Sequence, residues 1–268
     1  MHDLSRYHTD KDTKEIYKEI FRNLLIVDSH THLGADIDKH SLAPKQLIAM
    51  MEKAGIDKAI SFPLNNPRYS KTFSIPNDSI LRASKRYPNR IIPFFRLNPN
   101  NDKWKAELKK RAEQGFRGIK LHPRSQRFRI NSKNAKEIFS EAEKKNLMLI
   151  IHTGFGVDRL AEDVAEVSRT FSKVRLILAH SAFPDMHKVI RKVSQRKNIL
   201  FETSSLRTFD IFDLLKKVSY KRVIFGSDTP YYDQILSLEV LINTAIILKK
   251  TQNQIKEMMG GNIIRWLK

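Results

Sequence analysis

The stretch L-M-L-I-I-H-T-G, residues 147–154, sets five consecutive apolar residues in front of a histidine. Five apolar residues suit a buried strand and fall far short of a membrane span. Residues 175–181 (R-L-I-L-A-H-S) and 222–228 (R-V-I-F-G-S-D) repeat this design. Strand-length apolar runs that end in a polar side chain are therefore the pattern from which the fold is worked out.

Eight such runs alternate with amphipathic stretches of helix length. The predicted strands span residues 24–28, 58–62, 91–97, 118–122, 147–152, 175–180, 199–202 and 222–226. The predicted helices span residues 44–54, 77–86, 102–114, 132–145, 157–171, 186–194, 209–218 and 233–249. Eight strands, each followed by a helix, predict an α/β fold, a single (β/α)8 TIM barrel with extra helices at both ends.

The main competing fold is a doubly wound nucleotide-binding sheet. That fold would want a G-x-G-x-x-G turn after the first strand, and residues 28–34 (D-S-H-T-H-L-G) do not supply one. Residues 1–23 precede the barrel and are expected to form a helical extension. Residues 24–268 then form one barrel domain, which ends in a helix over residues 251–268.

The composition excludes several classes of protein. The chain has no cysteine, which rules out a disulfide scaffold, a thiolate zinc site and a cysteine nucleophile. Its 49 Lys+Arg against 29 Asp+Glu give a formal net charge of +20. The positive residues are scattered over predicted helices, which favours a solvated basic surface over nucleic-acid binding. The polar N-terminus has no signal peptide, so we expect a cytoplasmic protein without membrane contact.

Five of the nine histidines fall at or just past the ends of predicted strands. In a barrel these ends meet at one mouth, where active sites are built. The five are His30, His32, His122, His152 and His180. Alternation along the first strand would place Asp28 on the same face as His30 and His32. Taken alone, the H-x-H pair is weak evidence for a metal site and fits a pair of hydrogen-bonded core histidines better.

Asp228 adds a carboxylate to the same mouth, because it follows the last predicted strand. A carboxylate buried after an apolar run needs a cation or hydrogen-bond donors. Imidazole nitrogens and carboxylate oxygens suit Zn²⁺, Mn²⁺ or Fe²⁺. The pattern therefore predicts a divalent metal site in which Asp228 also serves as general base toward a metal-activated water.

The fourth predicted strand places Lys120 and His122 on one face. A lysine inside a barrel must pair with an acid, bind an anionic group or carry CO₂ as a carbamate bridging two metals. At the rim, His122, Arg124 and Arg96 could bind a substrate carboxylate or phosphate. Glu202 ends the seventh predicted strand, and its role stays open between a substrate contact and a structural hydrogen bond.

Together these motifs resemble the amidohydrolase superfamily, specifically its amidohydrolase-2 branch of metal-dependent hydrolases and decarboxylases. The resemblance rests on D-x-H-x-H at 28–32, the segment 118–123, the two later strand-ending histidines and G-S-D at 226–228, and it spans about residues 26–265. It implies a single catalytic metal, zinc before manganese or iron. The implied ligands are His30, His32, His152 and Asp228.

The resemblance also implies that His180 polarises the substrate or acts as acid or base. In binuclear relatives this histidine binds a second metal, and a carboxylated lysine or a glutamate bridges the two ions. Lys120 stands where that bridge would be, so the number of ions, one or two, stays open.

The implied reaction is attack of a metal-activated water on an amide, ester or lactone carbonyl of a small-molecule substrate. Basic loop residues favour an anionic substrate. The first alternative is a non-hydrolytic decarboxylase with the same metal site. The second is a TatD-type deoxyribonuclease, whose relatives usually place a glutamate where this chain has Lys120. The third is a non-catalytic binding barrel. A homodimer is common for this type of barrel, but the sequence fixes neither the oligomeric state nor the substrate.

Overall fold

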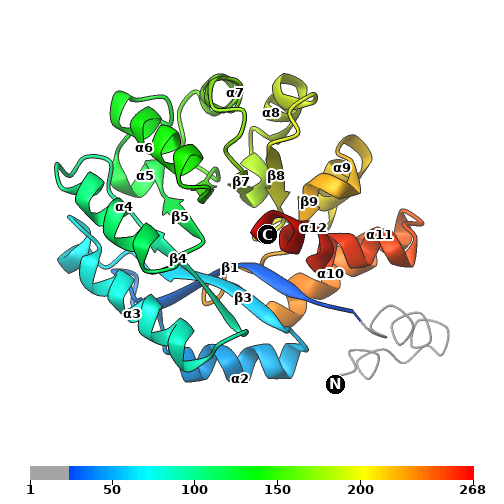
Figure 1. The fold of residues 1–268 in the computed structure, drawn as a ribbon. Coiled ribbons are helices and arrows are strands. Elements are labelled where there is room, and N and C mark those ends of the chain that lie inside the picture. Colours follow the sequence, from blue (N-terminus) through cyan, green and yellow to red (C-terminus); the bar gives the residue numbers. More distant parts are fainter. Residues whose placement is uncertain (1–23) are drawn as a thin grey trace.

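The structure, a computed structural model, describes residues 24–268 (Figure 1). The helix expected over residues 1–23 lies outside the described residues. Eight strands pair in parallel, each with the next along the chain. They are β1 (Val27–Ala35), β3 (Lys58–Pro63), β4 (Ile91–Arg96), β5 (Gly118–Leu121), β6 (Met148–His152), β7 (Leu176–Ala179), β8 (Ile199–Glu202) and β9 (Val223–Ile224). The two-residue β2 (Ser41–Leu42) pairs antiparallel with the end of β1.

Backbone hydrogen bonds between β1 and the segment after β9 close this sheet into a barrel. Ser29 N donates to Phe225 O over 3.0 Å, and His32 N donates to Thr229 O over 2.8 Å. Thr31 and Thr229 also form a parallel bridge. The predicted single (β/α)8 barrel is therefore confirmed.

The helices between the strands form the outer layer of the ring in Figure 1. They are α2 (Pro44–Ala54), α3 (Ser74–Arg86), α4 (Trp104–Glu113), α6 (Lys133–Lys144), α7 (Leu160–Thr170), α8 (Met186–Val193), α9 (Thr208–Lys217) and α10 (Gln234–Ile247). Each lies close to its predicted range because its apolar stripe is buried against the sheet. A one-turn helix that the sequence did not predict, α5 (Pro123–Gln126), follows β5. None of the helices within residues 24–268 is long and apolar enough to cross a membrane.

The C-terminal segment covers the end of the barrel at which the strands begin. The single helix predicted over residues 251–268 consists of α11 (Gln252–Lys256), the π-helical turn η5 (Glu257–Gly261) and α12 (Asn262–Leu267). In Figure 1, α12 lies near the centre of the ring. Ile263 packs among the apolar side chains inside the barrel, and Arg175, just before β7, donates to the carbonyl of Trp266. The carboxyl ends of the strands are left as the end at which a site can form.

Strand β1 differs from its prediction in a way that shapes the site. It begins at Val27 and continues to Ala35, whereas residues 24–28 were predicted. Its register against β3 shifts between Asp28 and Thr31, which is a β-bulge. Because an extra residue reverses the alternation of side chains, Val27 faces the barrel interior below the bulge, and His30 and His32 face it above the bulge.

Candidate metal centre

A cavity of about 820 Å³ opens at the carboxyl ends of the strands. All nine site residues predicted from the sequence line it: His30, His32, Arg96, Lys120, His122, Arg124, His152, His180 and Asp228. They come from six of the eight parallel strands or from the loops that follow them. A cavity of this size is typical of small-molecule sites.

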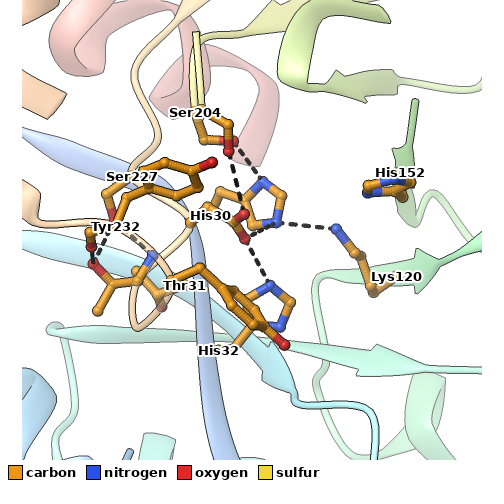
Figure 2. A network of polar contacts seen from close by, with 12 residues as sticks. His30, Thr31, His32, Lys120, His152, Ser204, Ser227 and Tyr232 are labelled. Atoms are coloured by element: carbon orange, nitrogen blue, oxygen red, sulfur yellow. Dashed lines mark hydrogen bonds and ion pairs between the residues drawn. The ribbon is translucent and has the colours of Figure 1, made fainter. Parts of the chain in front are cut away.

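The innermost group consists of His30, His32 and Asp228, whose ligand atoms all lie within 4.8 Å of one another. Asp228 Oδ1 is 3.1 Å from His30 Nε2 and 3.0 Å from His32 Nε2. Figure 2 shows the two imidazoles converging from β1. Burial lowers the pKa of both histidines, so they are neutral imidazoles at neutral pH. Neutral imidazole is the form that binds a metal.

Asp228 is held in place by its own backbone. Its N–H donates to the carbonyl of His30 over 2.8 Å, and its φ of 65° lies in the left-handed region that aspartate tolerates. Burial raises the pKa of its carboxyl group, but the electrostatic interactions with the His30 and His180 rings and the hydrogen bond with His32 outweigh that effect and hold the pKa below its usual range. Asp228 is therefore a carboxylate at neutral pH.

Glu202, at the end of β8, supports this group from behind. Its Oε2 lies 2.8 Å from His30 Nδ1, and the side chain is fully buried. A carboxylate only accepts hydrogen bonds, so Nδ1 of His30 carries the proton and Nε2 keeps its lone pair. That lone pair lies 3.1 Å from Asp228 Oδ1, a second acceptor, and Lys120 Nζ, also 3.1 Å from this nitrogen, is a donor that two acceptors this close require. Of the two roles that the sequence left open for Glu202, the structure shows the hydrogen bond.

His152 and His180 lie beside this group. His180 Nε2 is 3.1 Å from His152 Nδ1, while His152 Nε2 is buried without a hydrogen-bond partner among residues 24–268. His152 does not belong to the set of atoms within 4.8 Å of one another, and Figure 2 shows it apart from His30 and His32. His180 instead forms a second such set with His30 and Glu202.

Lys120 reaches the centre of the site from β5. Its Nζ lies 3.1 Å from His30 Nε2 and 4.5 Å from the centre of the Phe62 ring, and the side chain is buried. Burial lowers the pKa of Lys120 to about 7. At such a pKa a substantial fraction of the side chain is the neutral amine, the form that can react with CO₂.

The side of the cavity next to Lys120 is basic. Arg96 is buried and donates to Ser125 Oγ over 3.0 Å, and burial lowers its pKa to about 10, which leaves it cationic at neutral pH. His122 stacks on His152 with ring centres 3.9 Å apart. Arg124 is exposed at the rim, in the short helix α5. These three predicted substrate contacts therefore lie along one wall.

The cavity is also lined by residues that the sequence analysis missed. The Tyr231 hydroxyl donates to the Asp36 carboxylate, and the Tyr231 ring meets the His32 ring edge-on with centres 5.5 Å apart. Burial and the neighbouring Asp36 raise the pKa of Tyr231, so it stays a neutral phenol. Tyr231 could have been predicted to line the cavity because it lies three residues after Asp228. The loop that carries Asp36 has no sequence feature that indicates a place in the site.

Asp28 does not share the face of His30 and His32, so that prediction is wrong. Its carboxylate accepts from Ser227 Oγ over 2.6 Å and from Gln234 Nε2, at the start of α10, over 2.9 Å. The bulge in β1 separates it from the two histidines. Asp28 therefore anchors the segment that carries Asp228 and does not line the cavity.

The sequence model of the family described as Amidohydrolase (Amidohydro_2) matches residues 27–268. The chain belongs to this family, as its motifs predicted. Membership implies an enzyme, and the family is generally metal-dependent. The donor set of two imidazoles and one carboxylate fits a divalent ion, as does the buried and unpartnered Nε2 of His152.

Three solved structures show the same fold. A 5-carboxyvanillate decarboxylase from Sphingomonas paucimobilis is 12% identical with a TM-score of 0.73, and the match covers 91% of this chain and 99% of that one. An amidohydrolase from Burkholderia multivorans is 13% identical with a TM-score of 0.70 and the same coverage. An uncharacterized TIM-barrel protein from Bordetella bronchiseptica is 16% identical with a TM-score of 0.69, covering 91% and 98%. No match was found among the curated proteins.

Proposed function

We propose that this chain is a metal-dependent hydrolase that cleaves an amide, ester or lactone bond of a small anionic substrate. The observation that carries the proposal is the convergence of His30, His32 and Asp228 in the floor of a cavity large enough for a small molecule. Together with His152 they would hold one divalent ion, zinc before manganese or iron. His180 and a carboxylated Lys120 would complete the set if there were two ions. When bound, such an ion lowers the pKa of water and polarises a carbonyl.

The remaining chemistry belongs to side chains of the chain. Asp228 is a carboxylate at neutral pH and would accept the proton of the attacking water at an oxygen atom. His180, beside the central group, would polarise the substrate or act as acid or base, accepting a proton at Nε2 before passing it to the leaving group. Arg96, Arg124 and His122 would bind an anionic group of the substrate, with the arginines suited to bidentate contact with a carboxylate.

The test measures metal content and hydrolysis together. Protein purified without added metal should carry about one divalent ion per chain and hydrolyse at least one member of a panel of carboxylated amides, esters and lactones. His30→Ala combined with His32→Ala should lose both properties. A double variant that kept both would overturn the proposal.

A decarboxylase with the same metal ligands is the second candidate. It is favoured by the basic wall of the cavity, which could hold a carboxylate next to the metal group, and by the decarboxylase among the structures of the same fold. CO₂ release from aromatic or enol-forming carboxylic acids, without hydrolysis of the panel, would decide for this candidate.

A further inference from the structure

A chain of buried hydrogen bonds runs from Glu202 through Ser204 and His180 to His152. Ser204 Oγ lies 2.8 Å from Glu202 Oε2 and 2.9 Å from His180 Nδ1. His180 Nε2 lies 3.1 Å from His152 Nδ1. Figure 2 shows Ser204 next to His30, and Ser204 Oγ also lies 3.2 Å from His30 Nδ1. Glu202 and Ser204 are fully buried, so water does not compete for these contacts.

The direction of every bond in this chain follows from its first member. Although burial raises the pKa of Glu202, its carboxylate faces the main-chain N–H groups of His180 and Ser204, which only donate. These donors stabilise the ionised form, which can only accept. The Ser204 hydroxyl therefore gives its proton to Glu202 and accepts from His180 Nδ1. The carbonyl of Ser204 is a second, more distant acceptor, 3.3 Å from the same Nδ1.

The same logic continues to the last histidine. With its proton on Nδ1, His180 offers a lone pair at Nε2, and this nitrogen must accept from His152 Nδ1. His152 is then left with a lone pair on Nε2, the buried nitrogen that has no partner in residues 24–268. His30, bonded to Glu202 directly, carries its proton on Nδ1 for the same reason.

We propose that Glu202, acting through Ser204, sets the tautomers of His30, His180 and His152, so that Nε2 carries a lone pair in all three and that of His152 points to no other partner in residues 24–268. Glu202 and Ser204 are thus positioning residues that touch neither substrate nor metal. The assignment of the tautomers does not depend on the proposed function. Only its consequence does, namely that His152 is ready to bind a metal before any metal arrives.

Two glycines are placed as this arrangement requires. A Cβ on Gly226 would press on the Glu202 carboxylate, at 2.7 Å from its Cδ. A Cβ on Gly154 would lie 3.2 Å from both His152 Nε2 and His180 Cδ2. The backbone of a glycine therefore packs directly against Glu202 and against His152, the two ends of the hydrogen-bonded series, and this close contact keeps both side chains in position.

The test reads the tautomers directly in metal-free protein. In protein labelled with ¹⁵N-histidine, and assigned by substituting each histidine in turn, long-range ¹H–¹⁵N spectra show which ring nitrogen carries the proton. We expect Nδ1–H for His30, His180 and His152. Ser204→Ala leaves His180 Nδ1 with only the more distant carbonyl of residue 204 as acceptor, so His180 and His152 should become mixtures of tautomers. His30 should keep its proton on Nδ1, because its bond to Glu202 is direct. Ser204→Thr retains the hydroxyl and should restore the wild-type pattern.

Ser168→Ala is the matched control, since this buried serine donates to a helix carbonyl remote from the site. It should leave all three tautomers unchanged. A second readout is zinc affinity, which should fall about tenfold in Ser204→Ala and recover in Ser204→Thr, the effect expected when a partner of a metal-binding histidine is lost.

The proposal is overturned if wild-type His180 or His152 carries its proton on Nε2, or if Ser204→Ala leaves both tautomers unchanged. Failure of the proposed function gives a different result. A wild-type protein that binds no zinc but shows the three Nδ1–H tautomers would contradict the metal site and support the role of Glu202 and Ser204 in setting the tautomers.

Discussion

Substituting Gly226 with alanine tests how tightly the support of the site is built. The new methyl group would lie 2.7 Å from Glu202 Cδ and 3.0 Å from its Cγ, with the carboxylate oxygen closer still. The Glu202 side chain is fully buried and bonded to His30, Ser204 and His180, so it cannot swing into solvent. Relief of the clash must therefore move the carboxylate and weaken those bonds.

The magnitude follows from two terms. Overpacking a rigid core costs about 1–3 kcal/mol, and a weakened hydrogen bond to a buried charged group costs about 1.5–3 kcal/mol. We expect Gly226→Ala to reduce the free energy of unfolding by about 3–4 kcal/mol, measured by urea denaturation of the metal-free protein. A loss of this size lowers the Tm of a domain of this length by roughly 10 °C.

The control is Gly261→Ala, in the π-helical turn. There the three atoms nearest to the new methyl group all belong to the carboxylate end of Glu257, whose side chain is 24% exposed and can move aside. Its free energy of unfolding should stay within about 1 kcal/mol of the wild type. If Gly226→Ala were as stable as Gly261→Ala, the Glu202 carboxylate would not be fixed where the structure places it, and the reasoning would be refuted.

Four further predictions concern stability, pH, metal and substrate. Arg111→Met should cost about 3–5 kcal/mol in urea denaturation, since it removes the cation 2.5 Å from the nearly buried Glu107 carboxylate and leaves that charge only the neutral donors Ser74 and Asn77. Burial raises the pKa of Asp78, but the hydrogen bond and charge of Arg111 hold it below 3.8. The ionised Asp78 therefore stabilises the fold fully above pH 3.8, and this contribution is lost as the pH falls below that value. In Asp78→Asn, this part of the acid-induced loss of unfolding free energy should be missing. Chelation of the metal should lower the Tm of the wild type but not that of His32→Ala, which lacks a ligand of the site. A metal ion present at a hundred times its Kd adds about 2.7 kcal/mol to the free energy of unfolding, and chelation removes this contribution. Arg124→Gln should raise KM about tenfold for an anionic substrate with little change in kcat, because binding energy common to ground and transition states is lost.

Each of these predictions has a result that contradicts it. An Arg111→Met loss below 1 kcal/mol would mean that Glu107 finds other partners. An Asp78→Asn profile that keeps the wild-type acid limb would deny the pKa argument. Equal Tm losses on chelation in wild type and His32→Ala would place the metal elsewhere. An Arg124→Gln effect matched by Arg169→Gln, on the exposed side of α7, would reduce the role of Arg124 to general surface charge.

The barrel was predictable because its strands are short apolar runs that end in polar residues. Burial of those runs dictates the strands, and the carboxyl ends of parallel strands share one mouth. His152 and His180, which follow such runs directly, were thus placed correctly at a single cavity. The same logic placed Asp228 and Lys120 there, although nothing in the sequence gives the distances between them.

The bulge in β1 could not be predicted. A period of two places Asp28 with His30 and His32, and a single inserted residue reverses that assignment. Bulges depend on the backbone pairing of neighbouring strands, here β3 and the segment after β9, and this pairing leaves no signal in residues 28–32 themselves.

The chain of hydrogen bonds from Glu202 to His152 could not be predicted from the sequence either. Glu202 and Ser204 lie close together in the chain, but their partners His30 and His180 come from other strands. Only the closed barrel brings these side chains together. The pairing of Tyr231 with Asp36 has the same origin, since two loops far apart in the sequence meet over the mouth.

Metal content per chain, in wild type and in His32→Ala purified side by side without added metal, tests the central claim most directly. The account predicts about one divalent ion per wild-type chain, or about two if Lys120 is carboxylated, and far less in the variant. Wild-type protein that stays free of metal even after incubation with zinc, manganese or iron would contradict it.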